Sequence, residues 1–361
     1  MTRPTVAHID LSAIRHNYRI AKALAPRSRA AAVVKADGYG HGAVAVARAL
    51  EPDADAFAVA CVEEALELRE SGIGLPILLL EGVFTPDELS LVDQLGLVPV
   101  VHCDAQLGWL LAARPSRALE VWLKMDTGMH RLGLPPQRFA AARVALARCP
   151  HVGGVVLMSH FARADELGCD QTARQLALFE RYAGEPGAPR SLANSAAVLA
   201  WPAAHGDWVR PGIMLYGAQP LDTPHPAADR LRPAMTLESA LIGIRELAAG
   251  ETIGYGGRFV CDGRTRVGVV AVGYADGYPR HARDGTPVAV NGQPSRLIGR
   301  VSMDMITVDL TAQPEARLGD PVQLWGDQVP ANAVAAASDT IAYQLFTSLS
   351  PRVPRRYAGD A

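Results

Sequence analysis

Short runs of apolar residues recur through the first two thirds of the chain, each followed by a polar or amphipathic segment. Such runs are typical of strands buried on both faces of a parallel sheet. Between them, segments 62–71 and 85–96 place apolar residues at helical spacing and are predicted to be surface helices. Eight runs fit this description: 31–36, 56–60, 76–81, 97–102, 120–126, 152–160, 190–196 and 208–217. Strands alternating with helices predict an α/β fold, and eight repeats predict a closed, TIM-like (β/α)8 barrel over residues 1–230.

The pattern changes after about residue 230. Short segments of alternating apolar and polar residues follow one another there, separated by turn residues, and helical patterns are few. Asn291-Gly292 lies between two such segments and predicts a type I′ hairpin, because both turn positions need a positive φ. Residues 231–361 are therefore predicted to form a second, mostly antiparallel β domain with one late helix near 331–349.

Composition narrows the classes of function. The 361 residues include 35 Lys and Arg against 37 Asp and Glu, and a net charge of −2 argues against a nucleic-acid or anionic-membrane partner. The longest apolar stretch, near 75–82, falls short of the ~20 residues of a membrane span. Five scattered cysteines show no C-x-x-C spacing and the histidines no H-E-x-x-H pattern, so neither disulfides nor a metal site is predicted. Cysteine usage of this kind is typical of a reducing compartment and predicts a cytoplasmic protein.

The segment AVVKADGYGHGA, residues 32–43, offers the first candidate for chemistry. Lys35 follows an apolar run, and a glycine-rich turn begins directly after it. A lysine at a strand end can simply reach solvent or an acidic partner. In a barrel, however, the C-terminal strand ends carry the catalytic groups, and a desolvated lysine can act as a Schiff-base or general-base residue. Both interpretations remain open from the residues alone.

The same segment also satisfies a dinucleotide-binding pattern. Gly38 to Ala43 reads G-x-G-x-x-A, and Glu63 follows where a ribose-binding acid would lie. In that motif the strand runs directly into the first glycine, whereas here Lys35 and Asp37 intervene. A nicotinamide or flavin enzyme is therefore the less favoured alternative.

Several other predicted strands end in polar residues, which a barrel would bring to one mouth. Serine and tyrosine hydroxyls, with backbone N–H groups made accessible by glycine, suit a phosphate group. Each residue also has an ordinary structural interpretation, and Ser195, for example, is a candidate helix N-cap. The residues concerned are Tyr39, Lys124, Asp126, Arg131, His160, Asn194, Ser195, Arg210 and Gly212.

Nine segments along the chain, taken together and in order, resemble alanine racemases, a family of pyridoxal-phosphate enzymes. They are AVVKADGYGHGA, KMDTGMHRLG, SHFA, ANSAA, RPGIMLYG, IGYGGRF, VGYADGYPR, RVSMDM and SPRVPRRY. The resemblance runs from the first barrel strand almost to the C-terminus. It implies a (β/α)8 barrel followed by a β domain, which agrees with the pattern of apolar runs.

The resemblance also implies an activity and its two acid–base groups. The protein would interconvert L-alanine and D-alanine with pyridoxal 5′-phosphate and supply D-alanine for peptidoglycan. Lys35 would bind the cofactor covalently and move the α-proton on one face, and Tyr255 would serve the opposite face. In the family this tyrosine comes from the second subunit, so a homodimer with shared active sites is implied.

Further roles follow residue by residue from the same resemblance. Arg131 and Met303 would contact the substrate carboxylate, and His160 would link Tyr255 to Arg210, which faces the pyridine nitrogen. Lys124 matches a lysine that is often carbamylated in relatives, where it orients Arg131. The remaining cofactor contacts would be Tyr39, Asn194, Ser195, Gly212, Ile213 and Tyr343, and the remaining supporting residues Tyr274, at the entrance, and Asp304.

Three alternatives to an alanine racemase stay open. A racemase of serine, lysine or arginine would keep the same two acid–base groups and change only the pocket. A pyridoxal-phosphate decarboxylase would share the architecture but lack the IGYGGRF and VGYADGYPR segments. A non-catalytic carrier of the cofactor would have no use for the second domain or for Tyr255.

Overall fold

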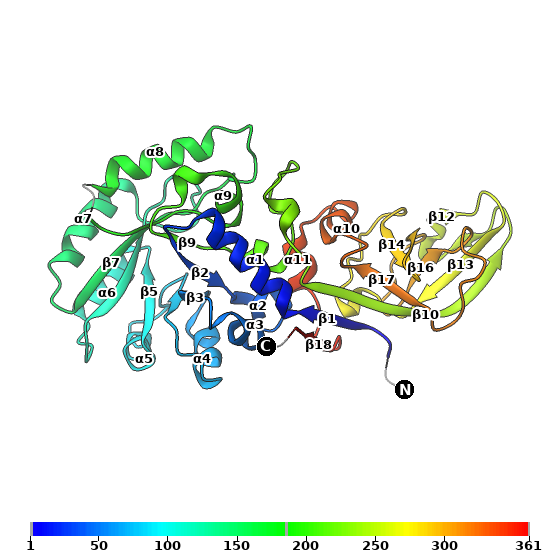
Figure 1. Ribbon diagram of the computed structural model, residues 1–361, viewed down its shortest axis with the longest axis horizontal. Coiled ribbons are helices and arrows are strands. Elements are labelled where there is room, and N and C mark those ends of the chain that lie inside the picture. The colour runs from blue at the N-terminus through cyan, green and yellow to red at the C-terminus, as the bar shows by residue number, and fades with distance from the viewer. Residues whose placement is uncertain (1–2, 185–186, 360–361) are drawn as a thin grey trace.

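The computed structural model describes residues 3–184 and 187–359 and divides the chain between two folded regions (Figure 1). Eight parallel strands close into a barrel with helices around it, and a mostly antiparallel sheet lies beside the barrel. The predicted fold class is therefore confirmed.

Each of the eight apolar runs overlaps one barrel strand, and β2 and β6 begin two residues and one residue before their predicted runs. The strands pair in chain order, and β9 closes the barrel by pairing with β2 through Arg29↔Trp208. They are β2 (Arg29–Val33), β3 (Ala56–Val59), β4 (Ile77–Leu79), β5 (Leu97–Val101), β6 (Leu119–Lys124), β7 (Val152–Met158), β8 (Arg190–Ser191) and β9 (Trp208–Val209). All residues of β3 and β4 are buried, which explains why these strands show no alternation of apolar and polar residues.

Helices surround the barrel and begin and end at recognisable residues. Asp10 caps the first helix through two backbone N–H groups, and Gly96 ends α5 in the left-handed conformation. The α-helices of this region are α1 (Leu11–Leu24), α2 (Lys35–Gly40), α3 (Ala43–Leu50), α4 (Val62–Glu70), α5 (Glu88–Leu95), α6 (Asp104–Ala112), α7 (Pro136–Ala147), α8 (Gln171–Ala183) and α9 (Ser195–Ala200). Three 3-10 turns follow, namely η1 (Pro202–Ala204), η2 (Ile213–Tyr216) and η3 (Ala228–Arg230).

The second region is built on one sheet with the order β15-β14-β17-β10-β1-β18, to which β13 and β16 add through β10. Its strands include β10 (Met235–Leu247), β13 (Thr265–Val270), β14 (Pro287–Val290), β15 (Gln293–Arg296), β16 (Ile306–Asp309), β17 (Pro321–Trp325) and β18 (Arg355–Ala358). A small hairpin of β11 (Thr252–Ile253) and β12 (Phe259–Val260) flanks the 3-10 turn η4 (Tyr255–Gly257), and η5 (Tyr274–Asp276) follows β13. Strand β1 (Val6–Asp10) lies within the range predicted for the barrel, but it joins this sheet between β10 and β18.

Two local predictions for the β domain had different outcomes. The hairpin at Asn291-Gly292 is confirmed, with φ values of 50° and 74° between β14 and β15. The prediction of a single late helix is wrong, because the structure has two helices there, α10 (Ala331–Ala337) and α11 (Ala342–Thr347). Asp339 takes a left-handed conformation (φ 50°), which aspartate tolerates better than most residues, and Ile341 is extended. The chain therefore turns at 338–341 and presents α11 to the barrel.

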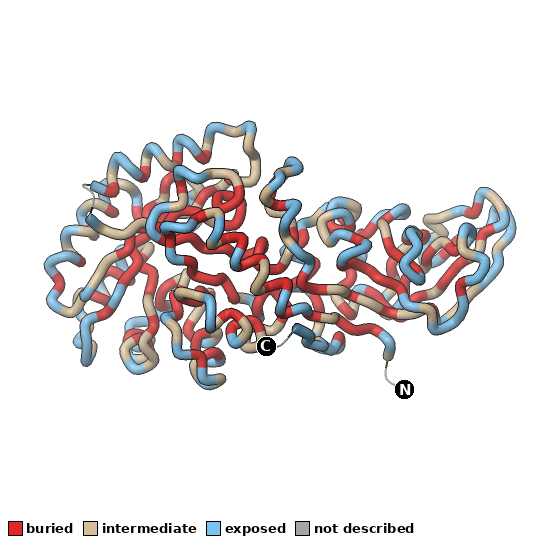
Figure 2. Tube along the Cα trace, viewed as in Figure 1, coloured by how far each residue is buried: buried red, intermediate tan, exposed pale blue. Residues whose placement is uncertain are grey.

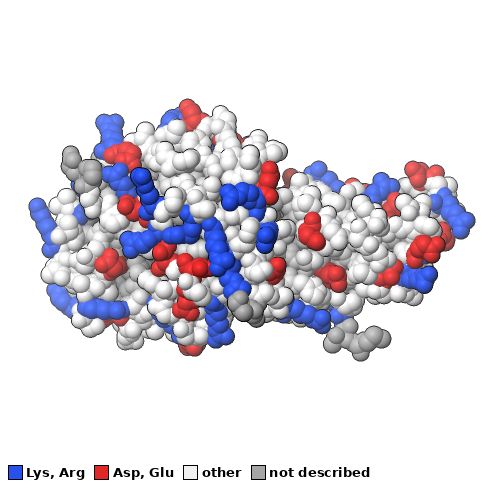
Figure 3. Space-filling view, in the orientation of Figure 1, with Lys and Arg blue, Asp and Glu red and all other residues white. Residues whose placement is uncertain are grey.

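Buried residues run continuously from the barrel strands into the central strands of the sheet (Figure 2). A separate small core of Ile253, Cys261, Val267 and Ile298 lies beneath the β11–β12 hairpin. On the face shown in Figure 3, basic and acidic side chains are interspersed over both regions. Within residues 3–184 and 187–359, no helix has the length and apolar composition needed to cross a bilayer.

Candidate active site

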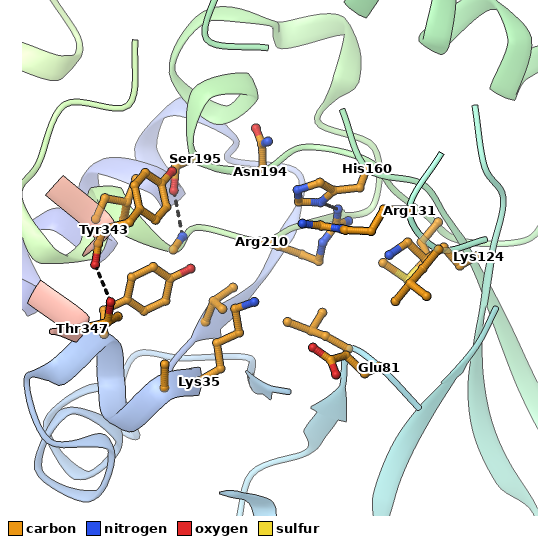
Figure 4. Close-up of a pocket in the computed structure, with 18 residues that line it drawn as sticks. Lys35, Glu81, Lys124, Arg131, His160, Asn194, Ser195, Arg210, Tyr343 and Thr347 are labelled. Atoms are coloured by element: carbon orange, nitrogen blue, oxygen red, sulfur yellow. Dashed lines mark hydrogen bonds between the residues drawn. The ribbon is translucent and has the colours of Figure 1, made fainter. Parts of the chain in front are cut away.

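The carboxyl ends of the barrel strands surround a cavity of about 500 Å³, a size usual for small-ligand and cofactor sites. Figure 4 shows Lys35 between two groups of side chains, with Ser195 and Tyr343 at one end and Lys124 and Arg131 at the other. Eleven predicted site residues line this cavity: Lys35, Tyr39, Lys124, Arg131, His160, Asn194, Ser195, Arg210, Gly212, Ile213 and Tyr343.

Lys35 and Tyr39 reach the cavity from an uncommon turn of backbone. Residues 36–39 all have φ between 52° and 59°, the left-handed region, which costs about 1–2 kcal/mol for each residue other than glycine. Hydrogen bonds hold this conformation. Asp37 accepts one from the first residue of α3 at 2.8 Å, and Glu64 accepts one from the backbone N–H of residue 36 at 2.7 Å.

The glycines of this turn allow the C-terminal part of the chain to pack closely against it. A Cβ on Gly40 would lie 2.2 Å from the Phe346 carbonyl oxygen, and one on Gly42 would lie 2.0 Å from the Tyr357 hydroxyl. Strand β2 belongs to a closed barrel and does not run into the first glycine. The dinucleotide-binding alternative is therefore wrong, because close packing within the chain explains these glycines.

Ser195 anchors the loop that forms one wall of the cavity. Its Oγ accepts hydrogen bonds from Gly212 N at 2.8 Å and Met214 N at 3.3 Å. The N-cap of α9 is Asn194, whose side chain accepts from Ala197 N at 3.1 Å, so the structural alternative for Ser195 is wrong. Because its oxygen already accepts twice, the Ser195 hydroxyl can only donate toward the cavity.

Three hydroxyls at this end fit a phosphate group. Among the described residues, the hydroxyls of Tyr39, Ser195 and Tyr343 donate to no protein acceptor. Burial raises the pKa of Tyr39 to about 12, which keeps its hydroxyl protonated as a donor. A Cβ on Gly212 would lie 2.7 Å from the Tyr39 oxygen, so only glycine leaves this space open.

Arg210 is buried at the base of the cavity and is held by carbonyl and hydroxyl oxygens. It donates to Ser191 Oγ at 2.6 Å, Ser159 O at 2.8 Å and Leu192 O at 3.1 Å. Burial lowers the pKa of Arg210 to about 10, so it stays charged near neutral pH. Four oriented contacts, one of them to His160 at 3.3 Å, fix the plane of its guanidinium group.

His160 lies against Arg210 in a defined protonation state. Burial lowers its pKa well below the usual range, and the charges of Arg210, Lys124 and Arg131 act in the same direction. A guanidinium group has no acceptor, so Nδ1 of the neutral ring must accept the hydrogen bond from Arg210. The ring hydrogen then lies on Nε2, which makes that nitrogen a donor.

Positive charge accumulates at the other end of the cavity. Lys124 is 7% exposed, and burial, followed by the charges of Arg210, Arg131 and Lys35, lowers its pKa to about 8. Glu81 is the acidic residue of the cavity lining and opposes this shift. Such a cavity favours an anionic ligand.

Sequence reasoning missed several residues of this lining. Glu81 ends the apolar run 76–81, so its position at a barrel strand end was the available signal. Thr347 follows Tyr343 by one helical turn and donates to its carbonyl oxygen at 2.8 Å. The other missed lining residues are Val33, Ala36, Leu80, Leu132 and Met158.

Four predicted site residues lie elsewhere, on the β domain. Tyr255 is 70% exposed in η4, Met303 is 53% exposed in the turn before β16, and Tyr274 is 37% exposed in η5. Asp304 is next to Met303 and pairs with two arginines. None of the four lines the barrel cavity. They form a second, separate group of predicted site residues on the surface of this chain.

A barrel mouth that presents a lysine, a buried arginine and three hydroxyls without an acceptor among the described residues defines an enzyme with a site for a phosphate-bearing cofactor. The chain belongs to the alanine racemase family. Residues 9–220 match the alanine racemase N-terminal domain, and residues 234–357 match the C-terminal domain. Alanine racemases are isomerases that depend on pyridoxal 5′-phosphate, and the donors at the cavity fit this cofactor.

Similar proteins cover the whole chain. An alanine racemase of Pseudomonas syringae is 57% identical over 99% of this chain and 100% of its own. A catabolic alanine racemase of Pseudomonas aeruginosa is also 57% identical, over 99% of both chains. The crystal structure of the biosynthetic alanine racemase of Pseudomonas aeruginosa superimposes with a TM-score of 0.96 at 52% identity, over 99% of this chain and 100% of that one.

Proposed function

We propose that this protein interconverts L-alanine and D-alanine with bound pyridoxal 5′-phosphate. The observation that carries the proposal is the convergence on one barrel cavity of Lys35, Arg210 and three hydroxyls that donate to no described residue, in a member of this family. When bound, the cofactor supplies the electron sink that makes the α-proton of an amino acid acidic.

Two parts of the cavity would bind two parts of this cofactor. Tyr39, Ser195 and Tyr343 donate to the phosphate, beside the Cβ-free position at Gly212 and its neighbour Ile213, while Asn194 holds the adjoining loop. Arg210, at the base of the cavity, would face the pyridine nitrogen. Because Arg210 keeps its proton and has no acceptor, it would leave that nitrogen unprotonated, which would weaken the electron sink that the cofactor supplies.

Two groups on opposite faces move the α-proton. Lys35, which would hold the cofactor through its amino group, would carry the proton on one face. Tyr255 of the partner subunit serves the other. His160 supports this step, because its Nε2 hydrogen is available to bond the phenol oxygen while Nδ1 remains bonded to Arg210.

Arg131 and Met303 hold the substrate carboxylate, with Met303 again coming from the partner subunit. Carbamylation of Lys124 would replace its positive charge with a negative one that can orient Arg131, and the pKa of about 8 leaves part of Lys124 as the free amine that this modification requires. Tyr274 of the partner subunit lines the entrance and Asp304 supports it.

This division of residues requires a homodimer with two shared active sites. The exposure of Tyr255, Met303 and Tyr274, all apolar or aromatic side chains on one domain, supports such an assembly. We further propose that the enzyme is cytoplasmic, where its five free cysteines would stay reduced, and supplies D-alanine for peptidoglycan.

The test is incubation of the purified enzyme with L-alanine. We expect D-alanine to form while total alanine stays constant, and turnover of serine, lysine and arginine to be slower. Release of carbon dioxide would instead identify a decarboxylase, and equal turnover of lysine or arginine would identify a broad-specificity racemase. No reaction with any of them would contradict the proposal.

A further inference from the structure

Two arginines from the opposite ends of the chain meet two aspartates of the β domain in one ion-pair network. Arg3 Nη2 lies 2.7 Å from Asp276 Oδ2, and Arg3 Nη1 lies 3.3 Å from Asp304 Oδ1. Arg352 Nη2 donates to Asp304 Oδ1 at 2.7 Å, and its Nε lies 3.0 Å from Asp276 Oδ1. Each arginine therefore contacts both aspartates. We call these four residues the arginine–aspartate network.

The network joins two loops of the β domain. Asp276 lies in η5 and Asp304 in the turn before β16, and Arg3 also donates to the backbone oxygen of Asp304 at 2.8 Å. The loops contact each other directly, because Tyr274 N donates to Ser302 O at 3.1 Å and Ala275 N donates to Met303 O at 3.0 Å. Moving one loop therefore moves the other.

The burial of the network distinguishes it from an ordinary surface ion pair. The Asp276 side chain is 1% exposed, whereas those of Arg3 and Arg352 are 29% and 40% exposed. A buried carboxylate is costly without cationic partners, so loss of either arginine should shift the loop toward water. Exposed ion pairs such as Arg19 with Asp53 have no such consequence.

The loop of Tyr255 has an anchor of its own. Arg258 donates to Gly299 O at 2.9 Å and to Ala282 O at 3.1 Å, and it pairs with Asp284 at 3.1 Å. Among the described residues, no hydrogen bond or ion pair joins the arginine–aspartate network to η4. Displacement of Met303 and displacement of the tyrosine are therefore separable by mutation.

We propose that Arg3 and Arg352 are positioning residues that set the place of Met303 and Tyr274, and through them the affinity for the substrate carboxylate. This assignment rests on the proposed function. Neither arginine touches substrate or cofactor. Their effect passes through Asp276 and Asp304, so it should appear in KM for alanine and leave kcat nearly unchanged.

Steady-state kinetics of the holoenzyme test the assignment with Arg3→Ala, Arg3→Lys, Arg352→Ala and the double alanine variant. We expect KM for alanine to rise about tenfold in each single alanine variant, the size of one lost charge-assisted contact, with kcat within about twofold. Because both arginines hold the same aspartates, the double variant should raise KM less than the product of the single effects. Arg3→Lys keeps the positive charge but loses the planar set of N–H donors of the guanidinium group. Its KM for alanine should therefore lie between those of the wild type and Arg3→Ala.

Arg19→Ala is the matched control, an exposed arginine on the barrel whose removal should change neither constant. An unchanged KM in Arg3→Ala and Arg352→Ala overturns the assignment, as does a fall in thermal stability without a change in KM. If one alanine variant does not fold, Arg3→Lys and the other single variant still decide. A wild-type protein that does not racemise alanine overturns the proposed function itself, which separates that failure from failure of this assignment.

Discussion

The barrel mouth and the exposed face of the β domain differ in how complete they are within one chain. At the barrel mouth, ten predicted residues of the barrel region and Tyr343 of α11 line a common cavity. On the β domain, Tyr255, Met303 and Tyr274 are exposed, and Figure 1 places β12, next to the Tyr255 turn, in the part of the domain away from the barrel. A single chain therefore assembles the cofactor half of the proposed site but leaves the second acid–base group facing outward.

The largest expected effect concerns the β-domain face. Tyr255→Phe should lower kcat for alanine by about a thousandfold, because one face loses its acid–base group. Absorption of the bound cofactor should be unchanged, since the barrel residues that hold it remain. The control is Tyr182→Phe, a tyrosine of α8. Loss of the cofactor in Tyr255→Phe, or full activity of this variant, would contradict the assignment of cofactor binding to the barrel and of the second acid–base group to the β domain.

A smaller effect is expected from the anchor of the tyrosine loop. Arg258→Ala removes the contacts to Gly299, Ala282 and Asp284, and displacement of the phenol should lower kcat about thirtyfold with little change in KM. This is the reverse of the result expected for Arg3→Ala. Kinetics of both variants, measured together, would contradict the two-anchor description if they changed the same constant.

Cofactor binding at the barrel mouth can be tested by adding a single methyl group at position 212. Gly212→Ala places a Cβ 2.7 Å from the Tyr39 hydroxyl and should weaken cofactor binding about tenfold through loss of one good hydrogen bond to phosphate. Titration of the cofactor-free protein by absorbance measures this change. Gly108→Ala in α6 is the control, because a Cβ there meets nothing within 4 Å. Equal affinities in both variants would show that the space above Gly212 is not needed.

The last effect concerns stability and its dependence on pH, through Lys124. Its folded pKa of about 8 lies below the usual lysine value, so the unfolded chain binds more protons between these values and stability rises with pH. Between pH 7 and 9.5 the cofactor-free wild type should gain about 2 kcal/mol of unfolding free energy relative to Lys124→Met. Denaturant unfolding measures the difference. Lys22→Met, which removes a lysine paired with Asp55, is the control. Its unfolding free energy should rise between pH 7 and 9.5 as much as that of the wild type.

The sequence predicted the barrel and its mouth because both depend on local signals. Each strand is a continuous apolar run, and a residue directly after such a run lies at the same rim as its counterparts on the other strands. Ser195 and Gly212, seventeen positions apart, lie in the last two predicted runs, 190–196 and 208–217, and the predicted barrel places both at its mouth. The late helix was predicted as one element because Ser338-Asp339-Thr340 interrupts a run of alanines without a glycine or proline.

Long-range contacts could not be derived in this way. Arg3 and Asp304 are 301 positions apart, and their pairing depends on β1, which is the one strand described before residue 230 that joins the sheet of the β domain. Glu81 was missed for a different reason. An acidic residue after a strand resembles an ordinary surface residue until the other strand ends are placed around it.

Complementation between two inactive variants tests the shared active site most directly. A heterodimer of Lys35→Ala and Tyr255→Phe chains, purified through different tags, would contain one site with both lesions and one with neither. We predict about half of wild-type activity for it, while a heterodimer of Lys35→Ala and Arg210→Ala chains, with one barrel lesion in each site, stays inactive. An inactive Lys35→Ala and Tyr255→Phe heterodimer would contradict the account, because it would mean that each chain supplies its own tyrosine.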